Sequence, residues 1–157
     1  MSKITIRPAT THDAKWLMNL YQQTIRTVNC KDYNKMQLEC WAPLDMETEV
    51  FERYIDLKKP FVATDGERIL GYSDLQPDGL IDHFYCHHQF QGQGVGRALM
   101  NVIHEKAIEM SLPKLYSYVS ITAKPFYHHF GFNIVRENEA NVRGVGLKNF
   151  LMEKEIG

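Results

Sequence analysis

Hydrophobic and polar positions alternate along several parts of the chain with a period of two, which is the pattern of half-buried strands. Residues 3–7 predict an opening strand that Pro8 ends. Residues 61–65 and 68–75 flank Asp65-Gly66-Glu67 and predict a β-hairpin, because an Asp-Gly pair between two apolar runs favours a tight turn. Three later strands are predicted over residues 115–121, 132–137 and 147–155.

Other segments carry hydrophobic residues at steps of three and four, which is the spacing of an amphipathic helix. Helices are predicted over residues 9–28, 33–41, 47–57 and 123–130. Thr11 and Asp13 are candidate caps of the first helix, and Pro125 fits the first turn of the last one.

The stretch from residue 80 to residue 110 joins both periods. An apolar run with aromatic residues predicts a strand over residues 80–86, and helical spacing follows from Val95 to Met110. Glycines at positions 92, 94 and 96 separate the two. Backbone N–H groups at the start of a helix lack partners, and glycine lets an anion approach them. The pattern therefore predicts a phosphate or pyrophosphate site, with a ligand-free tight turn as the alternative.

The order of these elements is typical of a mixed α/β sheet with mostly antiparallel strands and helices on both faces. The chain of 157 residues has the length of one domain, and we expect a single domain over residues 1–157.

Composition narrows the function classes. The formal net charge of −1 argues against nucleic acid as a partner. No apolar run approaches the ~18 residues that span a bilayer, so we expect a cytoplasmic protein without a membrane partner. The three cysteines form no CxxC motif, which argues against structural disulfides. The adjacent histidine pairs point apart and no HExxH occurs, so no metal is expected.

Two motifs point to one enzyme superfamily. The glycine turn reads Gln91-x-x-Gly94-x-Gly96, and a second motif further along reads Ala123-x-x-Phe126-Tyr127-x-x-x-Gly131-Phe132. Both resemble motifs of the GCN5-related N-acetyltransferase (GNAT) superfamily, in which the glycine turn binds the pyrophosphate of acyl-CoA. The resemblance covers essentially the whole chain. It implies a GNAT fold whose central sheet is splayed between the fourth and fifth strands, here residues 80–86 and 115–121.

The same resemblance implies acetyl-CoA as co-substrate and assigns residues to it. Strand residues would pair with the pantetheine amides, and backbone N–H groups of the glycine turn would hold the pyrophosphate. Ser120 stands where many members carry a cofactor-contacting Asn. The implied cofactor-binding residues are Phe84, Tyr85, Cys86, Gln91, Gly92, Gln93, Gly94, Val95, Gly96, Arg97, Ser120 and Phe126. Tyr127 occupies the position of the usual general acid.

The chemistry of acetyl transfer requires a base as well as an acid. An alkyl ammonium with a pKa of about 10 is protonated near neutral pH and cannot attack a thioester. It must lose a proton, and the departing thiolate must gain one. Asp82, a carboxylate in an otherwise apolar strand, is the first candidate for the base. His83, which points to the opposite face, is the alternative. Cys86 offers a covalent acyl-enzyme route, which the superfamily's direct transfer disfavours.

The acceptor site of this superfamily is built from the early helices. The run from residue 32 to residue 43 resembles that of bacterial, uncharacterised small-molecule acetyltransferases, and it places Tyr33, Gln37 and Trp41 at steps of four. We expect an N-acetyltransferase acting on the primary amine of a small molecule, as a monomer or a homodimer. The alternatives are acetylation of a protein or peptide amine, a non-catalytic acyl-CoA-binding module, and a nucleotide-binding protein.

Overall fold

The structure is a computed structural model that describes residues 3–157. Its strands are β1 (Thr5–Pro8), β2 (Phe61–Thr64), β3 (Ile69–Ser73), β4 (Phe84–Cys86), β5 (Lys114–Ser120), β6 (Asn133–Val142) and β7 (Val145–Glu155). Its α-helices are α1 (Ala14–Thr27), α2 (Lys35–Trp41), α3 (Thr48–Lys58), α4 (Val95–Glu109) and α5 (Lys124–His129). Short 3₁₀ turns are η1 (Thr11–Asp13), η2 (Asn29–Lys31) and η3 (His88–Phe90).

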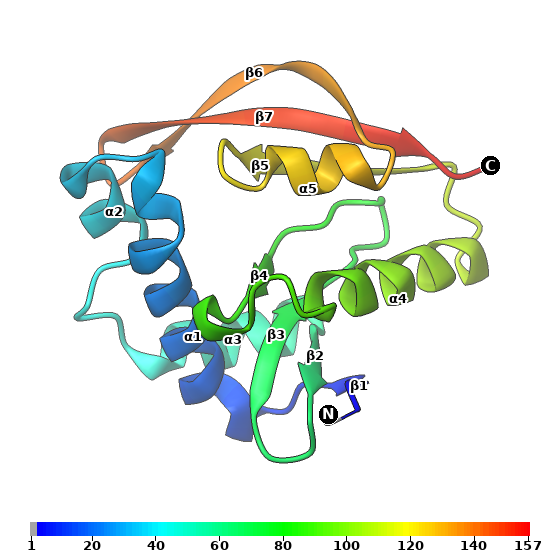
Figure 1. The fold of residues 1–157 in the computed structure, drawn as a ribbon, viewed down its shortest axis with the longest axis horizontal. Coiled ribbons are helices and arrows are strands. Elements are labelled where there is room, and N and C mark those ends of the chain that lie inside the picture. Colours follow the sequence, from blue (N-terminus) through cyan, green and yellow to red (C-terminus); the bar gives the residue numbers. More distant parts are fainter. Residues whose placement is uncertain (1–2) are drawn as a thin grey trace.

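The strands form two separate sheets, and Figure 1 shows β5, β6 and β7 on one side of the molecule and β1 to β4 on the other. The first sheet has the order β1-β2-β3-β4 and the second the order β5-β7-β6, with every pair inside them antiparallel. A single parallel bridge, between Leu80 and Tyr116, links the two among the residues that are described. The predicted splaying between the fourth and fifth strands is confirmed.

Helices cover both faces of the first sheet, as predicted. Phe61 and Ala63 of β2 point to one face, where they pack with Leu99 and Ile103 of α4. Val62 lies between them in sequence and points to the other face, where Tyr72 and residues of α1 and α3 form a second cluster. This alternation is the period of two that the sequence displays at β2 and β3.

The strand predicted over residues 80–86 is the main correction to the sequence analysis. Only its second half is regular, because β4 begins at Phe84. Residues 79–83 leave the edge of β3 and cross toward β5, where Ile81 N donates to Tyr116 O (2.9 Å) and Tyr116 N to Gly79 O (3.0 Å). The side chains of Ser73, the last residue of β3, and of Asp74 form hydrogen bonds with the backbone of residues 82–83, in place of the main-chain bonds that a strand would have made.

The final hairpin is longer than predicted. Strands β6 and β7 extend to Val142 and Val145, and Arg143 and Gly144 form the turn between them. Both turn residues have positive φ, at 51° and 84°, as a tight two-residue hairpin turn requires. Arginine is not a typical residue at this position, and for that reason the sequence pattern ended β6 too early.

No helix in residues 3–157 combines the length and the apolar character that a membrane crossing needs.

Candidate active site

The free edge of β4 forms one wall of the gap between the sheets. His87 N donates to Leu70 O at 2.7 Å. Since hydrogen-bonded positions alternate in an antiparallel pair, Tyr85 also turns its backbone groups toward β3, whereas those of Phe84 and Cys86 turn toward the gap. The Cys86 carbonyl accepts hydrogen bonds from Thr24 Oγ1 (3.0 Å) and Gln91 Nε2 (2.8 Å).

The glycine turn follows β4 and ends at the N-terminus of α4. Gly92 and Gly94 have φ angles of 74° and 86°, which favour glycine, and Gly94 is the N-cap of the helix. Gly96 is needed for a different reason, because a Cβ there would lie 2.8 Å from the ring of Phe126. The turn therefore presents backbone N–H groups at a helix start and brings α4 against α5, the helix of the second motif.

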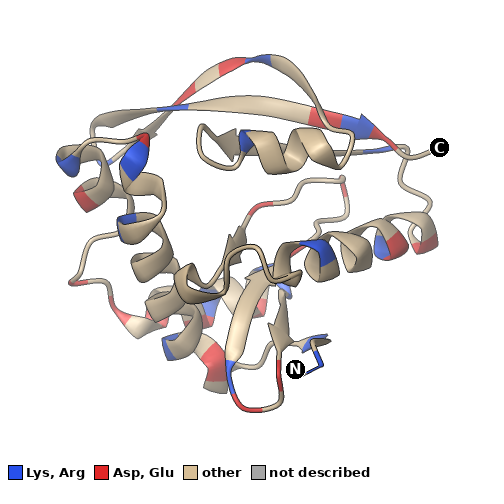
Figure 2. Ribbon diagram, in the orientation of Figure 1, with Lys and Arg blue, Asp and Glu red and all other residues tan. Residues whose placement is uncertain are grey.

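A narrow cleft of about 140 Å³ lies between β4 and the end of β5. Six of the residues assigned to acetyl-CoA line this cleft: Phe84, Tyr85, Cys86, Gln91, Ser120 and Phe126. Gly92, Gln93, Gly94, Val95, Gly96 and Arg97 continue from it along the turn and into α4. The first turns of α4 and α5 each carry a basic residue, Arg97 and Lys124 (Figure 2). The guanidinium of Arg97 lies over the ring of Phe130, and the ammonium of Lys124 lies over the ring of Phe150.

A second, wider cavity of about 260 Å³ adjoins the cleft. The two spaces share four lining residues, Phe84, Tyr85, Ser120 and Ala123. Aromatic side chains dominate the wall of the wider cavity, among them Tyr21, Tyr33, Trp41, Tyr85 and Tyr127. Asp82 is the acidic residue of this wall. The geometry therefore places a cleft for a long thin ligand end to end with an aromatic cavity.

Tyr127 lies in α5 and lines the wider cavity. Its ring packs on Phe84 and Phe132, with centroid distances of 5.8 and 5.1 Å. Burial raises the pKa of Tyr127 well above its ordinary value, and the polar side chain of Ser117 offsets part of this effect. The phenol therefore keeps its proton at neutral pH and has it available to donate.

The two base candidates, Asp82 and His83, line the same cavity but differ in environment. The Asp82 side chain is 37% exposed, and its Oδ2 lies 3.6 Å from Lys58 Nζ. His83 packs among aromatic rings, and its Nδ1 lies 3.0 Å from the Tyr72 hydroxyl. Burial lowers the pKa of His83, although Asp82 and Asp74 oppose this effect. The imidazole is therefore neutral near pH 7.

The predicted acceptor residues separate into two groups. Tyr33 and Trp41 line the cavity, and their rings meet edge to face at 5.2 Å. Gln37 does not line it and instead donates from Nε2 to Gly146 O at 3.0 Å. Tyr33 also fastens this region to the second sheet, because its hydroxyl donates to Lys148 O at 2.6 Å. Tyr33 lies before α2, which Asn34 caps, so the three residues do not share one helical face.

Several residues at the site carry no sequence motif. Asn29 and Thr24 line the cleft, Tyr21 lines the cavity, and the fully buried Asp74 lies behind Asp82 and His83. Only Asp74 could have been noticed in the sequence, as an acidic residue at the end of a buried strand.

The Cys86 thiol has its pKa raised to about 12 by burial, which makes it a poor nucleophile. Within residues 3–157, no three His, Cys, Asp or Glu side chains gather as metal ligands would.

Comparison with known proteins agrees with this geometry. The acetyltransferase (GNAT) domain family matches residues 29–156. Uncharacterized N-acetyltransferase YafP of Escherichia coli K12 is 24% identical over 97% of this chain and 96% of its own length. A crystal structure from Rhodopseudomonas palustris, described as a GCN5-related N-acetyltransferase (Aminotransferase, Class-II), superposes with a TM-score of 0.92 at 26% identity, covering 99% and 97% of the two chains.

A more distant structure has the same fold. The PaiA N-acetyltransferase from Thermoplasma acidophilum, in complex with coenzyme A, has a TM-score of 0.79 at 16% identity, over 98% of this chain and 99% of that one. The family match covers most of the sequence and includes both motifs. The chain therefore belongs to the GNAT family of N-acetyltransferases.

Proposed function

We propose that this protein transfers an acetyl group from acetyl-CoA to the primary amine of a small molecule, by direct attack of the amine on the thioester. The observation that carries the proposal is the meeting of the narrow cleft with the aromatic cavity at Phe84, Tyr85, Ser120 and Ala123. A donor lying in the cleft and an acceptor in the cavity would meet where Tyr127 carries its proton.

The cleft fits the pantetheine and pyrophosphate parts of acetyl-CoA. The backbone groups of Phe84 and the backbone N–H of Cys86 face it and can pair with amides as a neighbouring strand would, whereas the Cys86 carbonyl is bound by Thr24 and Gln91. The glycine turn supplies N–H groups at the N-terminus of α4 for the pyrophosphate. We assign Ser120 and Phe126 to the walls beside the thioester end.

Proton transfers complete the reaction. In our proposal Asp82 takes the proton from the acceptor ammonium, directly or through water, and His83 is the second candidate for this role. The amine then forms its bond to the acetyl carbon, the nitrogen gives up a second proton, and the carbon–sulfur bond breaks. Tyr127 donates its proton to the departing thiolate, whose free thiol has a pKa of about 8.5. The proton released from the nitrogen returns to Tyr127 through water and restores the acid.

The shape of the cavity favours a small amine over a protein or peptide amine. Tyr33 and Gln37 tie the α2 region to β7 through two hydrogen bonds, to Lys148 O and Gly146 O, and these bonds fix the wall that Tyr33 and Trp41 contribute to the cavity. The aromatic wall with one carboxylate suits a cationic amine on an apolar or aromatic body. Lys148 Nζ does not offer a site for a substrate carboxylate, because it pairs with Glu137 Oε1 at 2.9 Å.

A panel of acceptors tests the proposal. Acetyl-CoA is incubated with arylalkylamines, alkyl diamines, amino acids and peptides with free N-termini, and thiol release is measured. We expect turnover with arylalkylamines or alkyl amines and little with amino acids. Turnover with peptides alone would contradict the small-molecule acceptor. A protein that CoA stabilises but that turns over no amine would be a binding module.

Ligand identity can be tested separately by thermal shift with CoA, ATP and NAD. At about 100 times its dissociation constant, a ligand stabilises the folded protein by about 2.7 kcal/mol. We expect CoA to give this shift and the two nucleotides to give none. A shift with ATP or NAD alone would contradict the assignment of the cleft.

A further inference from the structure

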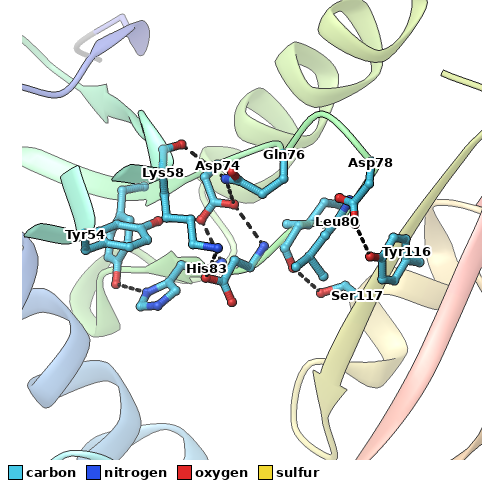
Figure 3. A network of polar contacts seen from close by, with 12 residues as sticks. Tyr54, Lys58, Asp74, Gln76, Asp78, Leu80, His83, Tyr116 and Ser117 are labelled. Atoms are coloured by element: carbon cyan, nitrogen blue, oxygen red, sulfur yellow. Dashed lines mark hydrogen bonds and ion pairs between the residues drawn. The ribbon is translucent and has the colours of Figure 1, made fainter. Parts of the chain in front are cut away.

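Asp74 is a fully buried carboxyl group that accepts hydrogen bonds from four groups (Figure 3). Its Oδ1 accepts from Asp82 N (2.9 Å) and Gln76 Nε2 (3.0 Å). Its Oδ2 accepts from His83 N (2.9 Å) and the Tyr54 hydroxyl (2.5 Å). Two of the four donors are therefore the backbone N–H groups of the residues that carry the base candidates.

These contacts replace the main-chain ladder between β3 and β4. Backbone groups of Tyr85 and His87 face β3, so the next position in the alternation is His83, opposite Asp74. There the His83 N–H meets the Asp74 side chain, and the His83 carbonyl accepts from Ser73 Oγ at 2.7 Å. The backbone at residues 82–83 is therefore further from β3 than a paired strand would be, because the side chains of Ser73 and Asp74 bridge the space between them.

The other side of the same segment is held by the second sheet. Ser117 Oγ donates to Ile81 O at 2.7 Å, next to the parallel bridge between Leu80 and Tyr116. Ser117 also lines the acceptor cavity, as Tyr127 does. The segment 79–83 thus lies between Asp74 on one side and Ser117 on the other, and both of these polar side chains are buried.

We infer that Asp74 is a positioning residue for acetyl transfer, which fixes Asp82 and His83 at the cavity wall opposite Tyr127 through their backbone N–H groups. Asp74 does not line the cavity, so it would act through Asp82 and His83 and not by contact with a substrate. This inference rests on the proposed function, because it assumes that the base and the acid face one another across the acceptor cavity. A misplacement of about 1 Å can lower an enzymatic rate by about 10²-fold.

The central test is Asp74→Asn, which keeps the shape but turns an NH₂ group toward donors that need an acceptor. We expect kcat to fall by about 10- to 100-fold, with the KM for acetyl-CoA changed less than about twofold. The split arises because the cofactor cleft lies beyond β4 and does not depend on residues 82–83. Equal losses in kcat and in CoA affinity, or an unchanged kcat, would overturn the inference.

Asp78→Asn is the matched control. Asp78 belongs to the same loop and also accepts two hydrogen bonds, from Leu80 N (3.1 Å) and the Tyr116 hydroxyl (2.6 Å), but it lies at the surface and does not contact residues 82–83. We expect its kcat to stay within about twofold of the wild type. A loss as large as that of Asp74→Asn would show that any damage to this loop has the same effect.

The pH profile gives a readout that a purely structural role would not change. The groups that face His83 are Asp82 beside it, Asp74 beyond β3, Lys58 and Tyr54 from α3, Tyr72 from β3, Tyr21 from α1 and Tyr85 from β4. The negative charge of Asp74 favours the imidazolium, so its removal lowers the pKa of His83 further. An acid-side limb governed by His83 should therefore move to lower pH in Asp74→Asn.

Backbone hydrogen exchange measured by NMR separates this inference from the proposed function, because it needs no turnover. In Asp74→Asn, the amides of Asp82 and His83 should exchange at least about tenfold faster, while those of β2 and β3 keep their protection. Unchanged exchange at residues 82–83 would overturn the inference even if no acceptor is known. If the Asn variant does not fold, Ser73→Ala removes the bond to the His83 carbonyl and a longer one to the Asp74 carbonyl (3.5 Å) but leaves the Asp74 side chain in place. A kcat loss of about three- to tenfold at constant KM is then expected.

Discussion

The two ends of the gap between the sheets are built in opposite ways. At its closed end, residues 79–83 are held by buried polar side chains of Ser73, Asp74 and Ser117. At its open end, β4 and the glycine turn offer backbone groups, and two of the three glycines have positive φ. The closed end fixes side chains in place, whereas the open end leaves the main chain accessible to a ligand.

The difference indicates a division of labour within one gap. A ligand with amides and phosphates can be bound by repeating backbone groups, which need small residues and few particular side chains. Proton transfer needs individual side chains at defined positions, which need support from their neighbours. Substitutions at the closed end should therefore change kcat, and those at the open end should change the KM for acetyl-CoA. The predictions below follow this division, starting from the largest expected effect.

Tyr127→Phe should have the largest effect, because it retains the ring and removes the proton. We expect kcat to fall by about 10²- to 10⁴-fold while CoA still binds, as measured by steady-state kinetics and calorimetry. Since burial raises the pKa of Tyr127, the wild-type rate should not decline on the alkaline side until above pH ~10, where ordinary tyrosines have already begun to ionise. A near-normal kcat in the variant would reduce Tyr127 to a packing residue.

Asp82→Asn should lower kcat/KM by about 10²-fold at neutral pH. The loss should shrink as pH approaches the pKa of the acceptor amine, because free amine then exists without help from a base. Asp56 is an exposed residue of α3, and Asp56→Asn provides a control for which we expect no change in kcat/KM. A loss that is equal at every pH would contradict a role as base and direct attention to His83→Asn, measured in the same way.

Gly94→Val should act at the open end and raise the KM for acetyl-CoA about tenfold or more, with a smaller effect on the KM for the amine. At a φ of 86°, valine is strained, and relief of the strain moves the turn away from the pyrophosphate position. Gly66→Val is a matched control, since Gly66 has a φ of 100° at the β2–β3 hairpin. If both variants raise the KM for acetyl-CoA equally, loss of stability rather than loss of the anion site is responsible.

Cys86→Ala should have the smallest effect, a change in kcat of less than about threefold. Burial raises the pKa of this thiol to about 12, so the thiolate needed for an acyl-enzyme is scarce at neutral pH. Mass spectrometry of the wild type after mixing with acetyl-CoA should show no acetylated enzyme. A stoichiometric acetyl adduct on Cys86 would contradict direct transfer.

Much of the open end could be predicted from the sequence because its determinants are local. Gly92, Gly94 and Gly96 lie within five consecutive positions, and the helix that follows has its own apolar period. The hairpin at Asp65-Gly66-Glu67 is equally local, and the structure confirms it. A short sequence window contains everything that specifies these features.

The closed end could not be predicted in the same way. Residues 80–86 read as one strand, and their interruption depends on Ser73, the last residue of β3, and on Asp74, which follows it. The role of Gln37 likewise depends on Gly146, a partner far away in sequence. Helical spacing grouped Gln37 with Trp41, but only the tertiary structure decides which of them faces the cavity.

The strand order β5-β7-β6 has a consequence for how this protein is made. During synthesis β5 and β6 leave the ribosome before β7, the strand that lies between them. Until β7 arrives, each of the two lacks its only neighbour in that sheet, whereas β1 to β4 can already pair. Domains generally begin to fold from the N-terminal side as they are synthesised. The first sheet, which leads into the glycine turn, can therefore form first. The second sheet, which contributes the opposite wall of the cleft, is completed only when β7 inserts between β5 and β6.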